Sequence, residues 1–229
     1  MEETHIYRLQ SKAQIRHSRI ILILVVFVLV WLAFHQGLLH AEEASTGHSR
    51  SQVDWEGILE GVSKGQDEDL NTHLMLAVSY ANLGMIPEAT REFRIIESSG
   101  YQEFGEGVIR ENSEKVKGSP DDIISLNLLA FAYYAFGEYE KSLECFESLM
   151  KQDPMNVWIH HYYAYSLAMV DRLDEAIDVL KAALEIDPSN DYTHLLLGLA
   201  YREKGWYVLS VLELARARRA LSVLRSLAD

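Results

Sequence analysis

One pattern recurs at a fixed step through the second half of this chain, and it constrains the fold more than any other feature. In each copy a large residue is followed by a small one and, after two further positions, by a second large residue. The copies are Leu129-Ala130-x-x-Tyr133, Tyr163-Ala164-x-x-Leu167 and Leu197-Gly198-x-x-Tyr201. Their first members lie at positions 129, 163 and 197, so the step is 34 residues. A constant period of this length predicts a stack of helix–turn–helix units.

Other positions keep the same step. Each copy is followed by a residue suited to a tight turn, and then by a small residue with a large one four positions later. The turn residues are Gly137, Asp171 and Gly205, and the small and large pairs are Ser142 and Phe146, Ala176 and Leu180, and Ser210 and Leu214. Two copies close with Asp-Pro, at residues 153–154 and 187–188. The arrangement resembles the tetratricopeptide repeat (TPR), whose pattern is Leu-Gly-x-x-Tyr, then Ala-x-x-x-Phe, then Pro.

The resemblance implies an all-α TPR helix-turn-helix solenoid over residues 70–229. An earlier copy has Leu76-Ala77-x-x-Tyr80, then Gly84, then Ala89-x-x-x-Phe93, and it forms the first repeat. The expected repeats are 70–103, 123–156, 157–190 and 191–229, with an insertion at 104–122. We expect this insertion to form either an additional short helix or an ordered loop.

Both ends of the array are expected to carry atypical helices, as terminal repeats commonly do. Residues 54–62 predict a short amphipathic helix that caps the first repeat, within a tether and capping segment at 40–69. The second helix of the last repeat is expected to run from Trp206 towards Leu227 and to cover that repeat. Its arginines face water in this interpretation, and the alternative is that they form a basic docking surface.

The N-terminal region predicts a single transmembrane helix at residues 20–39. Residues 20–34 are fifteen uninterrupted apolar side chains, and the low-charge span of about 20 residues is long enough to cross a bilayer. Four Lys/Arg precede the span, whereas Arg50 is the only one in the twenty residues after it. This asymmetry predicts a cytoplasmic tail at 1–19 and an extracytoplasmic TPR domain, in a single-pass plasma (inner) membrane protein. The alternative is a signal peptide cleaved after Ala41.

The charge of the chain argues against two classes of partner for the repeats. The formal net charge is −13, and residues 1–40 hold four basic and only two acidic residues, so the remainder is more acidic still. Such a domain would repel nucleic acid and anionic lipid head groups. We therefore expect no nucleic-acid partner, and contact with the lipid bilayer only through residues 20–39.

The resemblance also implies a concave groove lined by the first helix of each repeat. The positions that would face it are Ile124, Asn127, Phe131, Tyr134, Ala135, Trp158, His161, Tyr165, Ala168, Met169, Tyr192, Leu195, Leu199, Arg202 and Glu203. We expect an exposed set among them to bind a protein or peptide partner, because aromatic residues supply much of the binding energy at interfaces. That set is Phe131, Tyr134, Trp158, His161, Tyr165, Tyr192 and Arg202. The alternative is that the chain itself fills the groove, for example with residues 104–118, or that a neighbouring copy does.

No motif for catalysis or metal binding is present, so we expect no enzymatic activity, no catalytic residue, no metal site and no cofactor. His160 and His161 are adjacent on a helix and point to different faces, and with His194 we interpret them as packing residues. Cys145 is the single cysteine and is expected to be an inert core thiol.

Taken together, these features predict a membrane-anchored TPR scaffold or adaptor. It would bind a subunit of a membrane or envelope complex in its groove and help to assemble or stabilise that complex. Two alternatives remain at this point. One is a self-associating structural TPR protein, which would be a homo-oligomer. The other is a secreted soluble TPR binding module, which would follow from cleavage of the N-terminal segment.

Overall fold

The computed structural model describes residues 51–65, 69–99 and 101–226, and over these residues the chain is built of α-helices and turns without a strand. The helices are α2 (Trp55–Ser63), α3 (Leu70–Asn82), α4 (Ile86–Ser98), α5 (Tyr101–Gly118), α6 (Ile123–Ala135), α7 (Tyr139–Gln152), α8 (Val157–Met169), α9 (Leu173–Ile186), α10 (Asp191–Glu203), α11 (Tyr207–Arg216) and α12 (Arg218–Ser226). The prediction of an all-helical fold is confirmed. The predicted transmembrane helix at 20–39 lies outside the described residues, within which no helix is long and apolar enough to cross a membrane.

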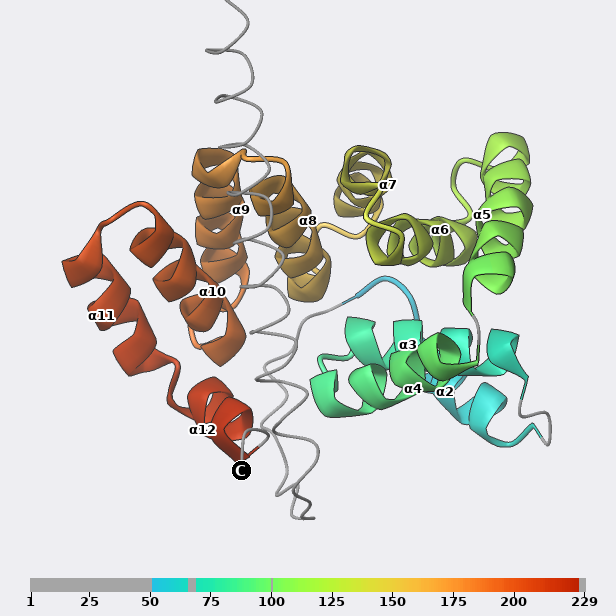
Figure 1. Ribbon diagram of the computed structural model, residues 1–229, viewed down its shortest axis with the longest axis horizontal. Coiled ribbons are helices and arrows are strands. Elements are labelled where there is room, and N and C mark those ends of the chain that lie inside the picture. Colours follow the sequence, from blue (N-terminus) through green and yellow to red (C-terminus); the bar gives the residue numbers. More distant parts are fainter. Residues whose placement is uncertain (1–50, 66–68, 100, 227–229) are drawn as a thin grey trace, which may run out of the picture.

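Four helix pairs form hairpins, α3 with α4, α6 with α7, α8 with α9, and α10 with α11 (Figure 1). The turn in each hairpin holds one residue in the left-handed backbone region. Gly84, Gly137 and Gly205 have φ of 74°, 71° and 76°, and Asp171 takes the same conformation with φ 68°. Glycine adopts this region without steric cost, and aspartate is one of the few other residues that tolerate it. The recurring turn residues in the sequence therefore mark the hairpin turns.

The first helix of each hairpin begins with a side-chain cap, and the second does not. Asp69, Asp122, Asn156 and Asn190 each accept a hydrogen bond from a backbone N–H in the first turn. Such caps satisfy amide groups that have no partner within the helix. The second helices α4, α7, α9 and α11 have no side-chain cap. The caps thus mark where each repeat starts.

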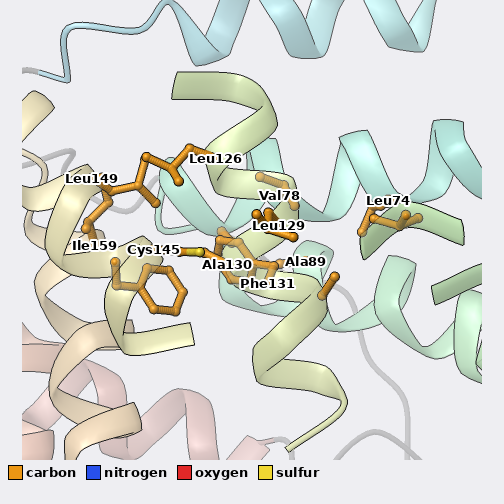
Figure 2. Packing of buried hydrophobic residues seen from close by; sticks show 14 of the residues in the cluster. Leu74, Val78, Ala89, Leu126, Leu129, Ala130, Phe131, Cys145, Leu149 and Ile159 are labelled. Carbon is orange, nitrogen blue, oxygen red and sulfur yellow. The ribbon is translucent and has the colours of Figure 1, made fainter. Parts of the chain in front are cut away.

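Small residues allow the two helices of a hairpin to approach closely. Ala77, Ala130, Ala164 and Gly198 are all buried. A Cβ atom added to Gly198 would lie 2.7 Å from Cγ of Leu214, which is too close for any larger side chain. Large side chains such as Phe146 fill the space between neighbouring helices. Figure 2 shows part of this core, with Val78 of α3 and Ala89 of α4 beside Ala130 of α6.

The insertion forms a long helix rather than a short one or a loop. Helix α5 has 18 residues and packs against α6, with Gly105 against the Phe136 ring and Val108 in the core. It takes the position that the second helix of a preceding repeat would occupy in a regular stack. Helices α3 and α4 are displaced from the line of the later hairpins and lie below α6 in Figure 1, with α3 in contact with both α6 and α8.

The expected single helix from Trp206 towards Leu227 was wrong, because the chain breaks at Ala217 into α11 and α12. The carboxylate of Asp191, at the start of α10, accepts a hydrogen bond of 2.6 Å from the backbone N–H of Arg219. This bond caps the new helix at its first turn. Ala217 and Ala220 are small enough to be buried against α10, so α12 folds back over that helix.

Candidate functional site

The predicted groove face, formed by the fifteen positions named above on α6, α8 and α10, is far less open than the sequence implied. Phe131 and His161 are only 3% and 5% exposed, so their assignment to an exposed set was wrong. Tyr134, Trp158, Tyr165 and Tyr192 are partly buried, and Arg202 alone of the seven predicted residues is exposed. The physical reason is that two segments of the same chain pack onto this face.

The first of these segments is the α3–α4 hairpin. Phe93 of α4 stacks on Phe131 of α6 with ring centroids 5.9 Å apart, and Phe131 meets Tyr162 of α8 edge-on at 4.6 Å. The turn of the hairpin lies on Trp158, since a Cβ atom on Gly84 would fall 1.9 Å from Cζ2 of that indole. Phe131 and Trp158 thus belong to a packed interface inside the chain.

Buried amides fix the hairpin in place. The Asn82 side chain donates to the backbone carbonyl of Val78 at 2.9 Å and to Oδ1 of Asn127 at 3.0 Å. In return, Oδ1 of Asn82 accepts a hydrogen bond of 2.9 Å from Asn156, the cap of α8. All three side chains are buried, and an unpaired amide there would cost free energy, so these bonds specify one docked position. We call Asn82, Asn127 and Asn156 the asparagine network.

The network continues towards the start of the described chain. Buried Asp153 accepts a hydrogen bond from Asn156 at 3.3 Å. Its two carboxylate oxygens also accept from the Ser51 hydroxyl at 2.5 Å and from the backbone N–H of Gln52 at 2.9 Å. Asp153 was recognised in the sequence only as part of a closing Asp-Pro. In the structure it ties the segment before α2 to the end of α7.

The second covering segment is α12, at the other end of the predicted groove face. Ala217 and Ala220 pack with Leu195 of α10, and Tyr192 and Leu199 lie at the edge of the same cluster. The alternative prediction, that the chain itself fills this face, is therefore correct for these residues. The segments that fill it are α3–α4 and α12 rather than residues 104–118.

One end of the predicted groove face stays accessible, at the C-terminal ends of α6, α8 and α10. We call Tyr134, Tyr165, Ala168, Met169 and Arg202 the open end. Ala168 and Arg202 are exposed, and the Tyr134 and Tyr165 rings lie 5.5 Å apart and share a hydrogen bond. Burial raises the pKa of Tyr165 to about 12, with a smaller contribution from nearby Tyr139. Its phenol is neutral at physiological pH and can both donate and accept hydrogen bonds.

Two buried histidines link helices, His161 between two repeats and His194 within the last hairpin. A hydrogen bond of 2.6 Å links Nε2 of His161 to the hydroxyl of Thr193, and His194 contacts Glu213 at 2.6 Å. Burial lowers the pKa of His161 to about 3, so its imidazole is neutral at physiological pH. We call His161, Thr193, His194 and Glu213 the histidine seam. Within residues 51–65, 69–99 and 101–226, no group of His, Cys, Asp or Glu side chains is placed to hold a metal ion.

The buried thiol of Cys145 fits the interpretation of an inert core residue. Burial, followed by the charge of Glu144, raises the pKa of Cys145 to about 12. A thiol is nucleophilic only as the thiolate, so this one is unreactive near neutral pH.

The sequence analysis missed an exposed apolar surface on α11. Tyr207, Val208, Val211 and Leu212 are 68%, 76%, 66% and 52% exposed. A signal for this surface was present in the repeat alignment, because the 34-residue step places charged residues at the positions of Val208 and Leu212 in the two preceding repeats. We call Tyr207, Val208, Val211, Leu212 and Ala215 the α11 strip.

Comparison with known families supports the repeat assignment. Residues 128–154 match a family model described as the tetratricopeptide repeat, and residues 171–205 match one described as the TPR repeat. Both segments fall within the hairpins α6–α7, α8–α9 and α10–α11. These matches show that the chain contains TPR repeats.

Curated relatives match over less than half of this chain. A TPR repeat-containing protein of Methanocaldococcus jannaschii is 30% identical over 110 residues, which are 48% of this chain and 19% of the relative. The TPR repeat-containing protein YpiA of Bacillus subtilis is 28% identical over 109 residues, 48% of this chain and 25% of the relative. The peroxisomal targeting signal receptor of Saccharomyces cerevisiae is 28% identical over 92 residues, 38% of this chain and 15% of the relative. This chain spans a quarter or less of the length of each.

Among solved structures, those titled MamA are similar to this chain in their helical fold. A crystal structure of MamA is 16% identical with a TM-score of 0.47, over 72% of this chain and 88% of that one. A double mutant titled MamA RS-1 ArsTM is 14% identical with a TM-score of 0.46, over 75% of this chain and 86% of that one.

Proposed function

We propose that this chain, which contains TPR repeats, is a non-catalytic scaffold held at a membrane by residues 20–39 and that it binds a protein partner there. The observation that carries the proposal is the open end of the predicted groove face. It combines two neutral tyrosines, a methionine and an exposed arginine on consecutive repeats. Tyrosine and arginine are enriched among the residues that dominate binding energy at protein interfaces.

The composition of the open end favours a peptide or a protein loop as the ligand. The Tyr165 phenol offers a donor and an acceptor, while the guanidinium of Arg202 lies next to the carboxylate of Glu203, with the two groups 3.8 Å apart. The backbone N–H and C=O groups of a bound peptide could form hydrogen bonds with these donors and acceptors. With α3–α4 and α12 packed on other parts of the face, the partner would contact a short stretch rather than follow the whole array.

The hydropathy of residues 20–39 supports the membrane attachment, and the positive charges before them support an extracytoplasmic position for the repeats. Attachment would raise the local concentration of the open end at the membrane, so a weak contact with a membrane-complex subunit would suffice. Assembly or stabilisation of an envelope complex at the plasma (inner) membrane follows as the proposed role.

The test is site-specific photo-crosslinking of the full chain in its native cell, with the probe at Ala168. This residue is small and exposed, so the probe disturbs no packing. Lys181, exposed on α9, is the matched control position. We expect a crosslink to a different protein from position 168 and none from position 181. Equal bands from both positions, or none from position 168, would refute docking at the open end.

The attachment has its own test. After separation of membranes and extraction at alkaline pH, the chain should stay in the membrane fraction, and its N-terminus should be intact by mass spectrometry. A chain that begins after Ala41 would instead establish the alternative, a secreted binding module.

A further inference from the structure

Two pairs of polar residues, spaced by the repeat, stand before α8 and α10. The first pair is Asp153 with Asn156, and the second is Asp187 with Asn190, 34 positions later. In each pair the asparagine amide donates to the carboxylate at 3.3 Å, and the asparagine oxygen caps the following helix. Because the two pairs are built alike, a difference in their contacts comes from other segments of the chain.

The two carboxylates differ in the residues that donate to them. Asp187 accepts hydrogen bonds from the N–H and the hydroxyl of Ser189, two positions later in the same turn, at 3.1 and 2.9 Å. Asp153 accepts instead from the hydroxyl of Ser51 at 2.5 Å and from the backbone N–H of Gln52 at 2.9 Å, 102 and 101 positions earlier. A distant segment thus supplies the same two kinds of donor that the last repeat supplies locally.

The asparagine beside Asp153 binds a second distant segment. We call residues 51–53 the strap. While the strap binds Asp153, the amide of Asn156 donates both to that carboxylate and to Oδ1 of Asn82, at the end of α3. The carboxylate therefore orients the amide that holds the α3–α4 hairpin, so the bonds of the strap and of the hairpin belong to one network.

The strap and the hairpin also belong to one packed body. Val53 and Trp55 lie in the same apolar cluster as Leu74 and Val78 of α3. Helix α2 packs on α3, and α3 packs on α4, more extensively than α3 packs on α6 or α8. The weaker side of this body is therefore the one that faces the later repeats, so α2, α3 and α4 can separate from those repeats together.

The environment of Asp153 makes release of the strap possible. Asp153 is fully buried, whereas Asp187 is partly exposed. At the position of Ser189 this repeat has Met155, which has no hydroxyl, so the strap supplies the one that binds the carboxylate. The strap itself is at the surface, with its three residues half-buried or exposed. Once the strap and the hairpin have left, Asp153 would be hydrated as Asp187 is, and no charge would stay buried without a partner.

We propose that the strap is a latch for a removable cover. While it binds Asp153, α2, α3 and α4 cover Phe131 and Trp158, and when it leaves, these helices undock together and uncover that part of the predicted groove face. Tyr162 contacts both Phe131 and Tyr134, with ring centroids at 4.6 and 6.5 Å, so the uncovered part would be continuous with the open end. The latch thus adds regulation to the proposed binding function, and only this consequence rests on that function.

The first test is hydrogen exchange of the purified full chain, read by mass spectrometry. Ser51→Ala removes a hydrogen bond to a buried carboxylate and should speed up exchange in α3 and α4 by about tenfold, with α10 and α11 unchanged. Adding Gln52→Pro removes the N–H donor as well and should increase the effect. The matched control is Ser189→Ala, which removes the corresponding bond to Asp187 and should leave exchange in α3 and α4 unchanged.

The second test is labelling of side chains by hydroxyl radicals, which reports the exposure of each residue. In the variant with both strap substitutions, labelling of Phe131 and Trp158 should rise because their cover has gone. Tyr201 of α10 is 7% exposed and packs in a different apolar cluster, so its labelling should stay at the native value. An unchanged circular dichroism spectrum verifies that the helices are retained.

Three results would overturn the proposal. One is native exchange in α3 and α4 after both strap substitutions, because the strap would then hold nothing. Another is an equal acceleration in α10 and α11, and the third is a rise in Tyr201 labelling equal to that of Phe131, since both would report a loss of overall stability. None of these measurements involves the crosslink from Ala168, so failure of the latch and failure of the proposed docking are distinguishable.

Discussion

The first and last hairpins share their internal construction and differ in what they pack against. Each has a left-handed glycine in its turn, and each pairs a histidine of the first helix with a glutamate 19 residues later, His73 with Glu92 at 2.7 Å and His194 with Glu213 at 2.6 Å. Yet α3–α4 is docked on other repeats through buried amides, whereas α11 leaves an apolar strip in water. The repeat pattern specifies a hairpin, and residues outside the pattern decide its neighbours.

The largest expected effect on the free energy of unfolding comes from comparing two residues at the same repeat position, one buried and one exposed. Ile177 of α9 is buried, and Val211 is its exposed counterpart in α11. Ile177→Ala should lower the free energy of unfolding by about 3.5 kcal/mol because it leaves a cavity. Val211→Ala should change it by less than about 0.5 kcal/mol. Urea denaturation of dilute protein measures both, and equal costs would show that α11 is covered within the monomer.

The glycine turns of the first and last hairpins give the next contrast. Gly84→Ala places a methyl group against the Trp158 ring and should destabilise the chain by about 3 kcal/mol, through overpacking and the left-handed backbone. Gly205→Ala has the same backbone conformation but meets open space, so it should cost about 1 kcal/mol. Thermal unfolding compares the two variants. A similar loss in both would argue against docking of the first hairpin on α8.

The asparagine network should hold the first hairpin specifically. Asn82→Ala leaves Asn127 and Asn156 without their partner and should cost about 2 kcal/mol. Hydrogen exchange should then speed up in α3 and α4 more than in α10 and α11. Exposed Glu97→Ala in α4 serves as the control and should leave exchange unchanged. Uniformly faster exchange would mean that the hairpin does not open as a unit.

Acid should act on the contact between α8 and α10, because the amides of the asparagine network do not titrate whereas the imidazole of His161 does. The folded-state pKa of His161 is lowered from 6.5 to about 3, so its contribution is fully present above pH 6.5 and is lost as the pH falls towards 3. His161→Gln should reduce the slope of unfolding free energy in that window by up to about 1.4 kcal/mol per pH unit. Denaturation of both proteins between pH 7 and 4 tests this, and identical slopes would contradict the buried neutral imidazole.

The sequence predicted the hairpins well because their determinants are local. The 34-residue step, the turn residues and the small residues at helix contacts each act within one repeat, and Gly198 against Leu214 shows the steric reason directly. The break at Ala217 was not predictable in this way. It depends on Asp191 capping a helix 28 residues later, a contact that no periodicity encodes.

The predicted site was less accurate because it, too, depends on contacts between residues far apart in the chain. The resemblance placed Phe131 and Trp158 on the expected face, but it assumed that the face is empty. Its occupation depends on Phe93 and Gly84, which belong to a hairpin separated from α6 along the chain by α5. Whether the open end binds a partner stays a prediction.

The asparagine network has a consequence for the order of folding. A repeat array can fold from any point, because each unit contacts only its neighbours in the chain. Here Asn82 bonds to residues 45 and 74 positions away, so the first hairpin can dock only after α6 and α8 have come together. Closing such long loops slows folding. The chain should therefore refold in two phases, with the repeats from α6 onward forming first and α3–α4 completing the molecule last.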